Sequence, residues 1–295
     1  MMTAGQFHLS FLPCEYPRGD AVNPACSKEQ IEAQFRAYFD RPWAVLTFNG
    51  RGALDAVMRS LKLERDDEVF VTTTFDYPNV SSCVTSTIFN HCKPARLLSE
   101  KSKAIVVIHE FGVPHKGTPQ LRELADQRGI PLIEDCAHTI DSRRDDWQVG
   151  YFGDFVIVSF SKVFPVPGGG MLLGKAVPCE LTDRELQSAI PLLPAAAAAL
   201  ADWPAQAHRR RAVFRSYAAS GLPALFEADE NVTPWFYPLE TPYWEDIMAA
   251  AAQQGIDCGR WHGTDIVVLP CHQYLCDADV DRISAMVTGV FAARA

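Results

Sequence analysis

The sequence predicts an α/β protein, with a mostly parallel sheet covered by helices and a smaller C-terminal α+β domain. Short apolar runs, such as WAVLTF at 43–48, AIVVIH at 104–109 and FVIVS at 155–159, alternate with segments of helical character. Strands without polar positions are typical of a sheet that is buried on both faces. The 295 residues are also enough for one large domain and a smaller one.

The first 26 residues contain proline, glycine and cysteine without periodicity, and we expect them to form an arm that lies over the fold. A helix should begin after Ser27, because Gln30 three residues later completes a capping-box pattern. The spacing I-x-x-x-F-x-x-x-F from residue 31 gives this helix an apolar stripe. The expected parts are an N-terminal arm, a large α/β domain, and a helical connection with a small C-terminal domain, at residues 1–26, 27–180 and 181–295.

Strands and helices are expected to alternate through the large domain. The predicted strands are residues 43–48, 68–71, 104–109, 130–134, 155–159 and 171–173. The predicted helices are residues 53–63, 77–89 and 118–127. Pro78 suits the first turn of the helix at 77–89. Gly129 suits a position just after the end of the helix at 118–127.

The pattern changes after Gly174. Residues 185–219 are rich in alanine and predict helix, with breaks at Pro191, Pro194 and Pro204. Strands are expected at 233–239 and 265–269, and helices at 243–254 and 277–293.

Charge and hydropathy argue against several classes of partner. The net charge is −9, from 27 basic and 36 acidic residues, and no basic run is longer than the three arginines at 209–211, so we expect no nucleic-acid binding. No stretch of about 18 apolar residues is present, so we expect no membrane span. The first residues also lack the pattern of a secretory signal.

The nine cysteines are odd in number and include no C-x-x-C pair. This argues against a disulfide framework and against a zinc site. We expect no metal, and we expect free thiols in a cytoplasmic protein.

Chemically unusual residues follow three of the predicted strands. The turn Asn49-Gly50-Arg51-Gly52 follows the first, Asp135 follows IPLIE, and Lys162 follows FVIVSFS. Ligands of open α/β sheets bind beyond the carboxyl ends of the strands. Taken singly, these features are most simply a turn, a helix cap and a solvated lysine.

Together they meet the requirements of pyridoxal 5′-phosphate (PLP). A glycine turn that opens a helix presents N–H groups to a phosphate. A carboxylate can hold a pyridine nitrogen in its protonated form, and a lysine can form a Schiff base with an aldehyde.

The sequence resembles the DegT/DnrJ/EryC1/StrS family of PLP-dependent sugar aminotransferases, over most of residues 27–292. The elements that carry the resemblance are D-E-V at 67–69, I-E-D-C-A-H at 133–138, V-G-Y-F-G-D at 149–154, S-F-S-K at 159–162 with G-G-G at 168–170, and L-P-C-H at 269–272 with D-V at 279–280. The resemblance implies a fold-type-I PLP-dependent transferase.

The resemblance also implies a role for each matching residue. Lys162 would hold PLP and move protons on the substrate, and Asp135 would pair with the pyridine nitrogen. His138 stands where relatives have a glutamine that contacts the phenolic oxygen. Ser159 and the amides of Gly50 and Arg51 would hold the phosphate. The residue that covers the ring face would be Phe75 or Tyr77.

The sequence also departs from the family pattern. Asn49-Gly50-Arg51 replaces the common Ser-Gly-Thr, so the Arg51 side chain either adds a cation near the phosphate or points away. Ser159 lies three residues before Lys162, whereas many relatives have five. No G-x-N-x-R element, which in many relatives crosses the dimer interface, follows the lysine. These departures make PLP chemistry better supported than a nucleotide-sugar substrate.

The favoured hypothesis is an aminotransferase that moves an amino group from an amino acid, with glutamate as the expected donor, to a keto sugar or a small keto metabolite. Lys162 argues against the dehydratase branch of the family, which replaces this lysine. A PLP enzyme of another type (elimination, decarboxylation or carbon–carbon bond formation) is the alternative, and a non-catalytic relative is a third.

The family resemblance implies a homodimer. Because the crossing element is missing, we expect another segment to complete the partner's site. The candidates are the loop around Trp147 and the arm, whose apolar residues Phe7, Leu9, Phe11 and Leu12 need burial.

Overall fold

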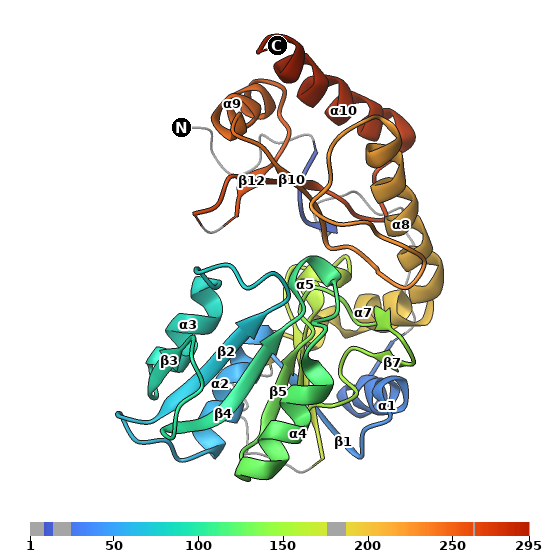
Figure 1. Ribbon diagram of the computed structural model, residues 1–295. Coiled ribbons are helices and arrows are strands. Elements are labelled where there is room, and N and C mark those ends of the chain that lie inside the picture. The colour runs from blue at the N-terminus through green and yellow to red at the C-terminus, as the bar shows by residue number, and fades with distance from the viewer. Residues whose placement is uncertain (1–8, 14–24, 176–186, 262, 295) are drawn as a thin grey trace.

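The computed structural model describes residues 9–13, 25–175, 187–261 and 263–294, and it contains a large and a small domain (Figure 1). The large domain is built on a seven-stranded sheet in the order β1-β9-β8-β5-β4-β2-β3. The small domain carries a three-stranded antiparallel sheet, β10-β12-β11. Helix α8 (Trp203–Ala219) runs along one side of the molecule and joins the two.

The large sheet is parallel except for one strand. Its members are β1 (Trp43–Thr47), β2 (Glu68–Thr73), β3 (Lys93–Ala95), β4 (Ser102–Ile108), β5 (Leu132–Asp135), β8 (Phe155–Ser159) and β9 (Gly170–Gly174). Strand β9 runs antiparallel to both of its neighbours, β1 and β8. The carboxyl ends of β1, β8, β5, β4 and β2 therefore meet at one edge, as the predicted mostly parallel sheet requires.

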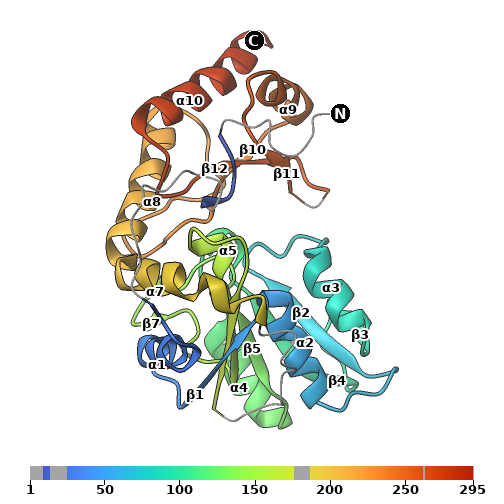
Figure 2. The same cartoon turned by 180° about the vertical axis from the view of Figure 1, so that it is seen from behind.

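Helices cover both faces of this sheet. Helices α2 (Gly50–Ser60) and α3 (Ser82–Phe89) pack on one face, while α1 (Lys28–Phe39) and α4 (Thr118–Arg128) pack on the other. Figures 1 and 2 show α4 and α2 on opposite sides of the strands. Helix α7 (Leu193–Ala201) packs beside α1. The three layers bury the apolar strands on both sides.

Several local predictions are confirmed. Ser27 and Gln30 form the capping box of α1, since the Gln30 N–H donates to the Ser27 hydroxyl and the Ser27 N–H donates to Gln30 Oε1. Gly129 ends α4 in the left-handed region, with φ 64°. The proline-broken helical stretch consists of a 3-10 turn (Ile190–Leu192), α7 and α8.

The predicted helix at 77–89 is wrong at its start, because α3 begins only at Ser82. The guanidinium of Arg96 donates to the carbonyl oxygens of Val71 and Tyr77 and to the Asp76 carboxylate, at 2.6, 3.0 and 2.7 Å. Asp76 itself has a positive φ of 53°. These contacts hold the segment around Pro78 in an irregular conformation.

Four very short strands were also not predicted, namely β3, β6 (Arg143–Arg144), β7 (Trp147–Gln148) and β11 (Gly259–Arg260). Two or three residues are too few to show a strand period. The expected domain boundary near residue 180 lies outside the described residues.

The small domain combines β10 (Phe236–Glu240) and β12 (Ile266–Pro270) with α9 (Trp244–Gln253) and α10 (Asp277–Ala292). The described part of the expected arm completes it. Leu9 is buried, and its backbone pairs with Gly255 and Asp257 at 3.2 and 2.7 Å. Phe11 packs against Phe236, with 4.9 Å between ring centroids. Phe7 lies outside the described residues.

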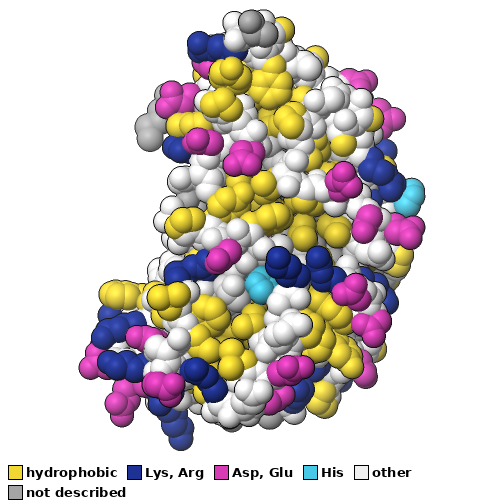
Figure 3. Space-filling view, viewed as in Figure 1, with side chains coloured by type: hydrophobic (Ala, Val, Ile, Leu, Met, Phe, Trp, Pro, Cys, Tyr) yellow, Lys and Arg dark blue, Asp and Glu magenta, His cyan; other side chains and the backbone are white. Residues whose placement is uncertain are grey.

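The two domains meet through an aromatic cluster. Phe75 and Phe111 of the large domain pack with Trp235, Phe236 and Trp261 of the small one. Figure 3 shows hydrophobic side chains gathered at the level where the two domains meet, with basic side chains and a histidine below them. In the described part of the chain, no helix has both the length and the apolar character needed to cross a bilayer.

Gly170 lets β9 fit between its neighbours. A Cβ atom at this position would lie 2.7 Å from the Asn49 carbonyl carbon and 2.7 Å from the Val158 carbonyl oxygen. We expect Gly170→Ala to lower the free energy of unfolding by about 1–3 kcal/mol, measured by urea denaturation, because the strand must shift.

Gly289→Ala is the matched control for this prediction. Gly289 lies in α10, and an added Cβ there meets nothing within 4 Å. It should raise the free energy of unfolding by about 0.5–1 kcal/mol through helix propensity. Equal stability of the two variants would contradict the packing argument.

Candidate active site

A cavity of about 200 Å³ lies at the edge of the large sheet where the parallel strands end. Six of the eight residues predicted for the site line it: Gly50, Arg51, Asp135, His138, Ser159 and Lys162. The rest of its lining is Asn49, Leu54, Ser81, Cys83, Val84, Ala137 and Ser161. The other two predicted residues, Phe75 and Tyr77, do not line it.

The N-terminus of α2 forms one wall. The Asn49 side chain caps the helix by accepting from the Gly52 N–H at 2.9 Å. The first N–H groups of a helix have no partner inside the helix, and they carry its positive dipole end. A Cβ atom at Gly50 would lie 3.2 Å from Ser159 Cβ, so the turn and the end of β8 are in close contact. This wall suits a phosphate.

Arg51 extends from the same turn toward α3. Its guanidinium donates to the Cys83 sulfur at 3.0 Å. Burial raises the pKa of the Cys83 thiol, but the hydrogen bond and positive charge of Arg51 outweigh it, and the pKa is lower than usual. Arg51 thus places a cation at this wall, beside a thiol that ionises readily.

Asp135 and Lys162 bring opposite charges to the cavity. Asp135 ends β5 and is 8% exposed, and its Oδ1 accepts from the Ala137 N–H at 2.9 Å. Burial raises the pKa of Asp135, and the charge of Lys162 partly offsets this. Burial lowers the pKa of Lys162, and the charge of Asp135 opposes that shift. Each charge therefore favours the ionised form of the other.

Lys162 lies in α5 (Phe160–Val163), a single helical turn directly after β8. The backbone carbonyls of Lys162 and Val163 accept from the Arg210 guanidinium of α8, at 3.0 and 2.9 Å. Arg210 also donates to Gln273 Oε1 at 2.7 Å. The small-domain side of the molecule therefore fixes the backbone that carries the lysine.

Trp235 is a site residue that the sequence did not indicate. The Lys162 Nζ lies 4.5 Å from the centroid of the Trp235 ring, in a cation–π contact. The His138 ring stacks on the same indole, with 3.9 Å between centroids. Trp235 immediately precedes β10, more than 70 positions from Lys162 in the chain. Only the packing of the two domains reveals its place.

His138 is held in one tautomer when neutral. Its Nδ1 accepts from the Phe111 N–H at 3.1 Å, so the ring proton must be on Nε2. His138 is 6% exposed and lines the cavity. The side chain can therefore donate a hydrogen bond from Nε2, which the role suggested by its sequence position requires.

A buried network supports the end of β5. Glu134 accepts from His109 Nε2 at 2.9 Å and from the N–H groups of Gly150 and Gly153 at 2.9 and 2.5 Å. Burial raises the pKa of Glu134, but these hydrogen bonds outweigh it and keep the pKa low. His109 and Glu134 also lie close enough to Cys136 to suggest metal ligands. Since the carboxylate and the imidazole already bond each other and the backbone, we assign the group a structural role.

The structure does not bring Phe75 and Tyr77 to the cavity. Phe75 packs against Phe111, with 5.8 Å between ring centroids, and Tyr77 packs against Phe75 at 6.2 Å. The hydrogen bond from Arg96 to the Tyr77 carbonyl keeps this segment out of α3. Ser81, Cys83 and Val84 form the cavity wall instead.

The chain is similar to proteins of known family and known structure. The model of the DegT/DnrJ/EryC1/StrS aminotransferase family matches residues 19–189. The chain belongs to this family. It is 28% identical over 163 residues to GDP-perosamine synthase of Vibrio cholerae, covering 50% of this chain and 44% of that one. It is 31% identical over 159 residues to dTDP-3-amino-3,4,6-trideoxy-alpha-D-glucose transaminase of Micromonospora megalomicea subsp. nigra, covering 49% and 42%. The chain thus spans less than half the length of these curated relatives.

Solved structures match over nearly the whole chain. The putative sugar aminotransferase Spr1654 of Streptococcus pneumoniae, in its apo form, has a TM-score of 0.75 at 16% identity and covers 93% of this chain and 92% of that one. The aminotransferase TlmJ of Streptoalloteichus hindustanus has a TM-score of 0.76 at 19% identity, with 92% of each chain covered. These family members confirm the predicted fold-type-I architecture, small domain included.

The Arg51–Cys83 contact makes Cys83 reactive. We expect iodoacetamide to label Cys83 faster near pH 7 than the exposed Cys276, because the lowered pKa of Cys83 favours its thiolate. Arg51→Ala should slow labelling of Cys83 by roughly threefold or more. Labelled peptides are counted by mass spectrometry against time.

Arg51→Lys is the control, because it keeps a positive charge near the thiol. Labelling of Cys83 should fall less in this variant than in Arg51→Ala. Unchanged labelling in Arg51→Ala would show that Arg51 does not activate the thiol.

Proposed function

We propose that the protein is a PLP-dependent aminotransferase that moves an amino group from an amino acid, with glutamate as the expected donor, to a keto sugar or a small keto metabolite. The observation that carries the proposal is a shared cavity, in which a buried carboxylate, a lysine and the N-terminus of α2 come together.

The residues present fit PLP. The close approach of Gly50 and Ser159 leaves a backbone cradle for a phosphate, with the cation of Arg51 at its wall. Asp135 would hold the proton of the pyridine nitrogen, and Ala137 lines the cavity two residues later. His138 Nε2 would donate to the phenolic oxygen. When bound, PLP supplies an electron sink for the carbanion that forms at the substrate.

The chain's own side chains explain how protons would move. Burial lowers the pKa of the Lys162 amine, so more of it is neutral and able to accept a proton near neutral pH. The aromatic contact with Trp235 limits the positions of Nζ. The aromatic cluster between the domains excludes water from that side of the lysine.

The relatives support a sugar as the acceptor. They are named as a GDP-perosamine synthase and as a transaminase of a dTDP-linked aminodeoxyglucose. The similarity covers only half of this chain, so a smaller keto acceptor stays within the proposal.

The same cavity also fits the alternative function, a PLP reaction of another type. The Trp235 indole beside Lys162 is the observation that favours this alternative. Trp235 occupies space beside the amine, where a large acceptor would have to enter. Product analysis with glutamate and keto acids separates the two reactions. The presence of Asp135, Ser159 and Lys162 in one cavity counts against a non-catalytic relative.

We also propose a cytoplasmic homodimer. Phe48 and Phe89 lie near α2 and α3 and are 48% and 55% exposed, which a second subunit would cover. Leu9 is already buried on its own small domain, and Phe11 is half-buried there against Phe236, so the burial of Leu9 needs no partner subunit. Free thiols at the described cysteines agree with a reducing compartment.

The cofactor assignment is tested by reduction. The protein purified with PLP should be yellow, and borohydride should fix the cofactor onto Lys162, as found by peptide mapping. Lys162→Arg should take no label, because a guanidinium cannot react in this way. Lys175→Arg, which changes an exposed lysine paired with Asp154, is the control and should label normally. A label on another lysine would refute the assignment.

Asp135→Asn tests the role of the carboxylate. Asparagine keeps the oxygen that accepts from Ala137 but removes the negative charge. We expect kcat at saturating PLP to fall by about a hundredfold or more, the scale of a lost electrostatic stabiliser. A thermal melt checks that the variant is folded. A rate close to that of the unmodified enzyme would exclude Asp135 as the partner of the pyridine nitrogen.

A further inference from the structure

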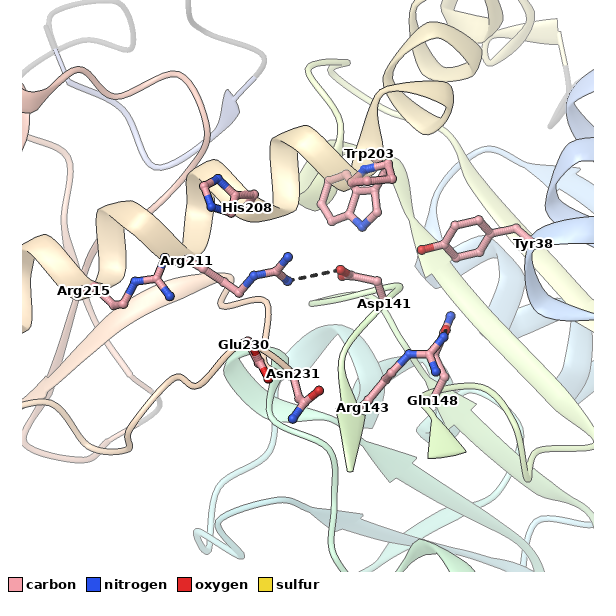
Figure 4. Close-up of a pocket in the computed structure, with 11 residues that line it drawn as sticks. Tyr38, Asp141, Arg143, Gln148, Trp203, His208, Arg211, Arg215, Glu230 and Asn231 are labelled. Carbon is pink, nitrogen blue, oxygen red and sulfur yellow. Dashed lines mark hydrogen bonds and ion pairs between the residues drawn. The ribbon is translucent and has the colours of Figure 1, made fainter. Parts of the chain in front are cut away.

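A second cavity lies between the large domain and α8, with a volume of about 770 Å³ (Figure 4). Its walls come from α1, from the hairpin β6–β7, from α8 and from the loop before β10. None of its described lining residues belongs to the candidate active site. It is therefore a separate site with its own chemistry.

Basic side chains line this cavity from both domains. His208, Arg211 and Arg215 lie on α8 at a spacing that places them on one face of the helix. Arg143 reaches the cavity from β6, on the large domain. Figure 4 shows these four side chains around the same space.

One of the arginines is already paired. Arg211 lies 3.5 Å from the Asp141 carboxylate and donates to Thr233 Oγ1 at 2.6 Å. Thr233 in turn donates to Asp141 at 2.9 Å. This triad is neutral and ties α8 to the large domain. The other charged residues of the described lining are Arg143, Arg215 and Glu230. Together they carry one more positive charge than negative.

A buried donor points into the same space. Trp203 is 1% exposed, and its Nε1 has no hydrogen-bond partner in the described part of the chain. Figure 4 shows this nitrogen directed toward the space between Trp203, Asp141 and Tyr38, with the Tyr38 hydroxyl facing it. Buried N–H groups normally donate to an acceptor, so this indole can donate to a ligand oxygen in the cavity.

The Tyr38 hydroxyl stays protonated. Burial raises its pKa, and the neighbouring Asp141 carboxylate raises it further. The side chain is therefore a second neutral donor beside the indole. The cavity offers guanidinium, indole and phenol donors, while its one central carboxylate is already engaged.

We propose that this cavity binds a small organic anion through a phosphate or carboxylate group, held by Arg143 and Arg215 and by the Trp203 N–H and Tyr38 O–H donors. Planar guanidinium groups match the oxygens of both kinds of anion. The combination of charge and neutral donors selects against cations.

The site is linked to the candidate active site through α8. Arg211 faces the anion cavity, while its neighbour Arg210 holds the backbone carbonyls of Lys162 and Val163. An anion that fastens α8 to the large domain therefore acts on the same helix that fixes the lysine. This is the route by which ligand binding would affect the reaction.

The test uses the full chain saturated with PLP, so that phosphate added as a probe does not enter the cofactor cavity. Inorganic phosphate and citrate are titrated separately at constant ionic strength, and binding is followed by calorimetry and by the indole N–H resonances. The resonance of Trp203 is assigned by its loss in Trp203→Phe. We expect one of the anions to bind with a Kd of about 1 mM or tighter and to shift this resonance.

The variants locate the binding. Arg143→Ala and Arg215→Ala should each weaken binding about tenfold or more, and Trp203→Phe, which removes the N–H donor together with part of the buried ring, about threefold to tenfold. Trp244→Phe, on α9, is the control and should bind as the unmodified chain does. Binding of phosphate alone indicates a phosphate ester as ligand, and binding of citrate alone indicates a polycarboxylate.

Two results would overturn the proposal. One is the absence of saturable binding by either anion. The other is binding that persists with unchanged affinity in the three cavity variants, because the anion would then occupy a different part of the protein. Neither result bears on whether Lys162 takes the cofactor.

Discussion

Asp135 and Lys162 bring opposite charges to one buried cavity, and each charge favours the ionised form of the other. Strands β5 and β8 pair in parallel, so their carboxyl ends open on the same cavity. Burial shifts the pKa of each group toward its neutral form, and the opposite charge resists that shift. The surrounding structure serves to hold both strand ends in place. The Glu134–His109 pair fixes the end of β5, and β9 is inserted beside β8 with only a glycine where the three backbones meet.

The small domain contributes more than a cover. Arg210 donates to the backbone carbonyl oxygens of Lys162 and Val163, and Trp235 lies against the Lys162 side chain. The lysine is thus fixed at its backbone by one segment of the small-domain side and at its amine by another. Since both segments follow α7 in the chain, a change in the angle between the domains moves the reactive amine relative to Asp135.

Much of the fold was predictable because the signals are local. Apolar runs gave the strands of the large sheet, and the Ser27–Gln30 pair gave the start of α1. Residues that directly follow strands, such as Asp135 and Lys162, could be placed at one edge from the parallel order alone. The predicted start of α3 was wrong. Pro78 suggests a helix, but Arg96, 18 residues later, holds the segment in a different conformation. Trp235 could not be found, because nothing in its neighbourhood in the sequence marks it, and its contacts depend on how the domains pack.

The bridge between Leu9 and residues 255–257 joins the two ends of the chain in one domain. During synthesis on the ribosome, the segment around Leu9 emerges about 250 residues before the segment with which it pairs. The pairing of β1 is delayed in a similar way, because its neighbour β9 lies more than 120 residues downstream. Contacts of this length slow folding and leave apolar segments exposed in the meantime. The small domain is thus completed by a segment that precedes the large domain in the chain, and a cut between the two domains would separate it from part of its own core.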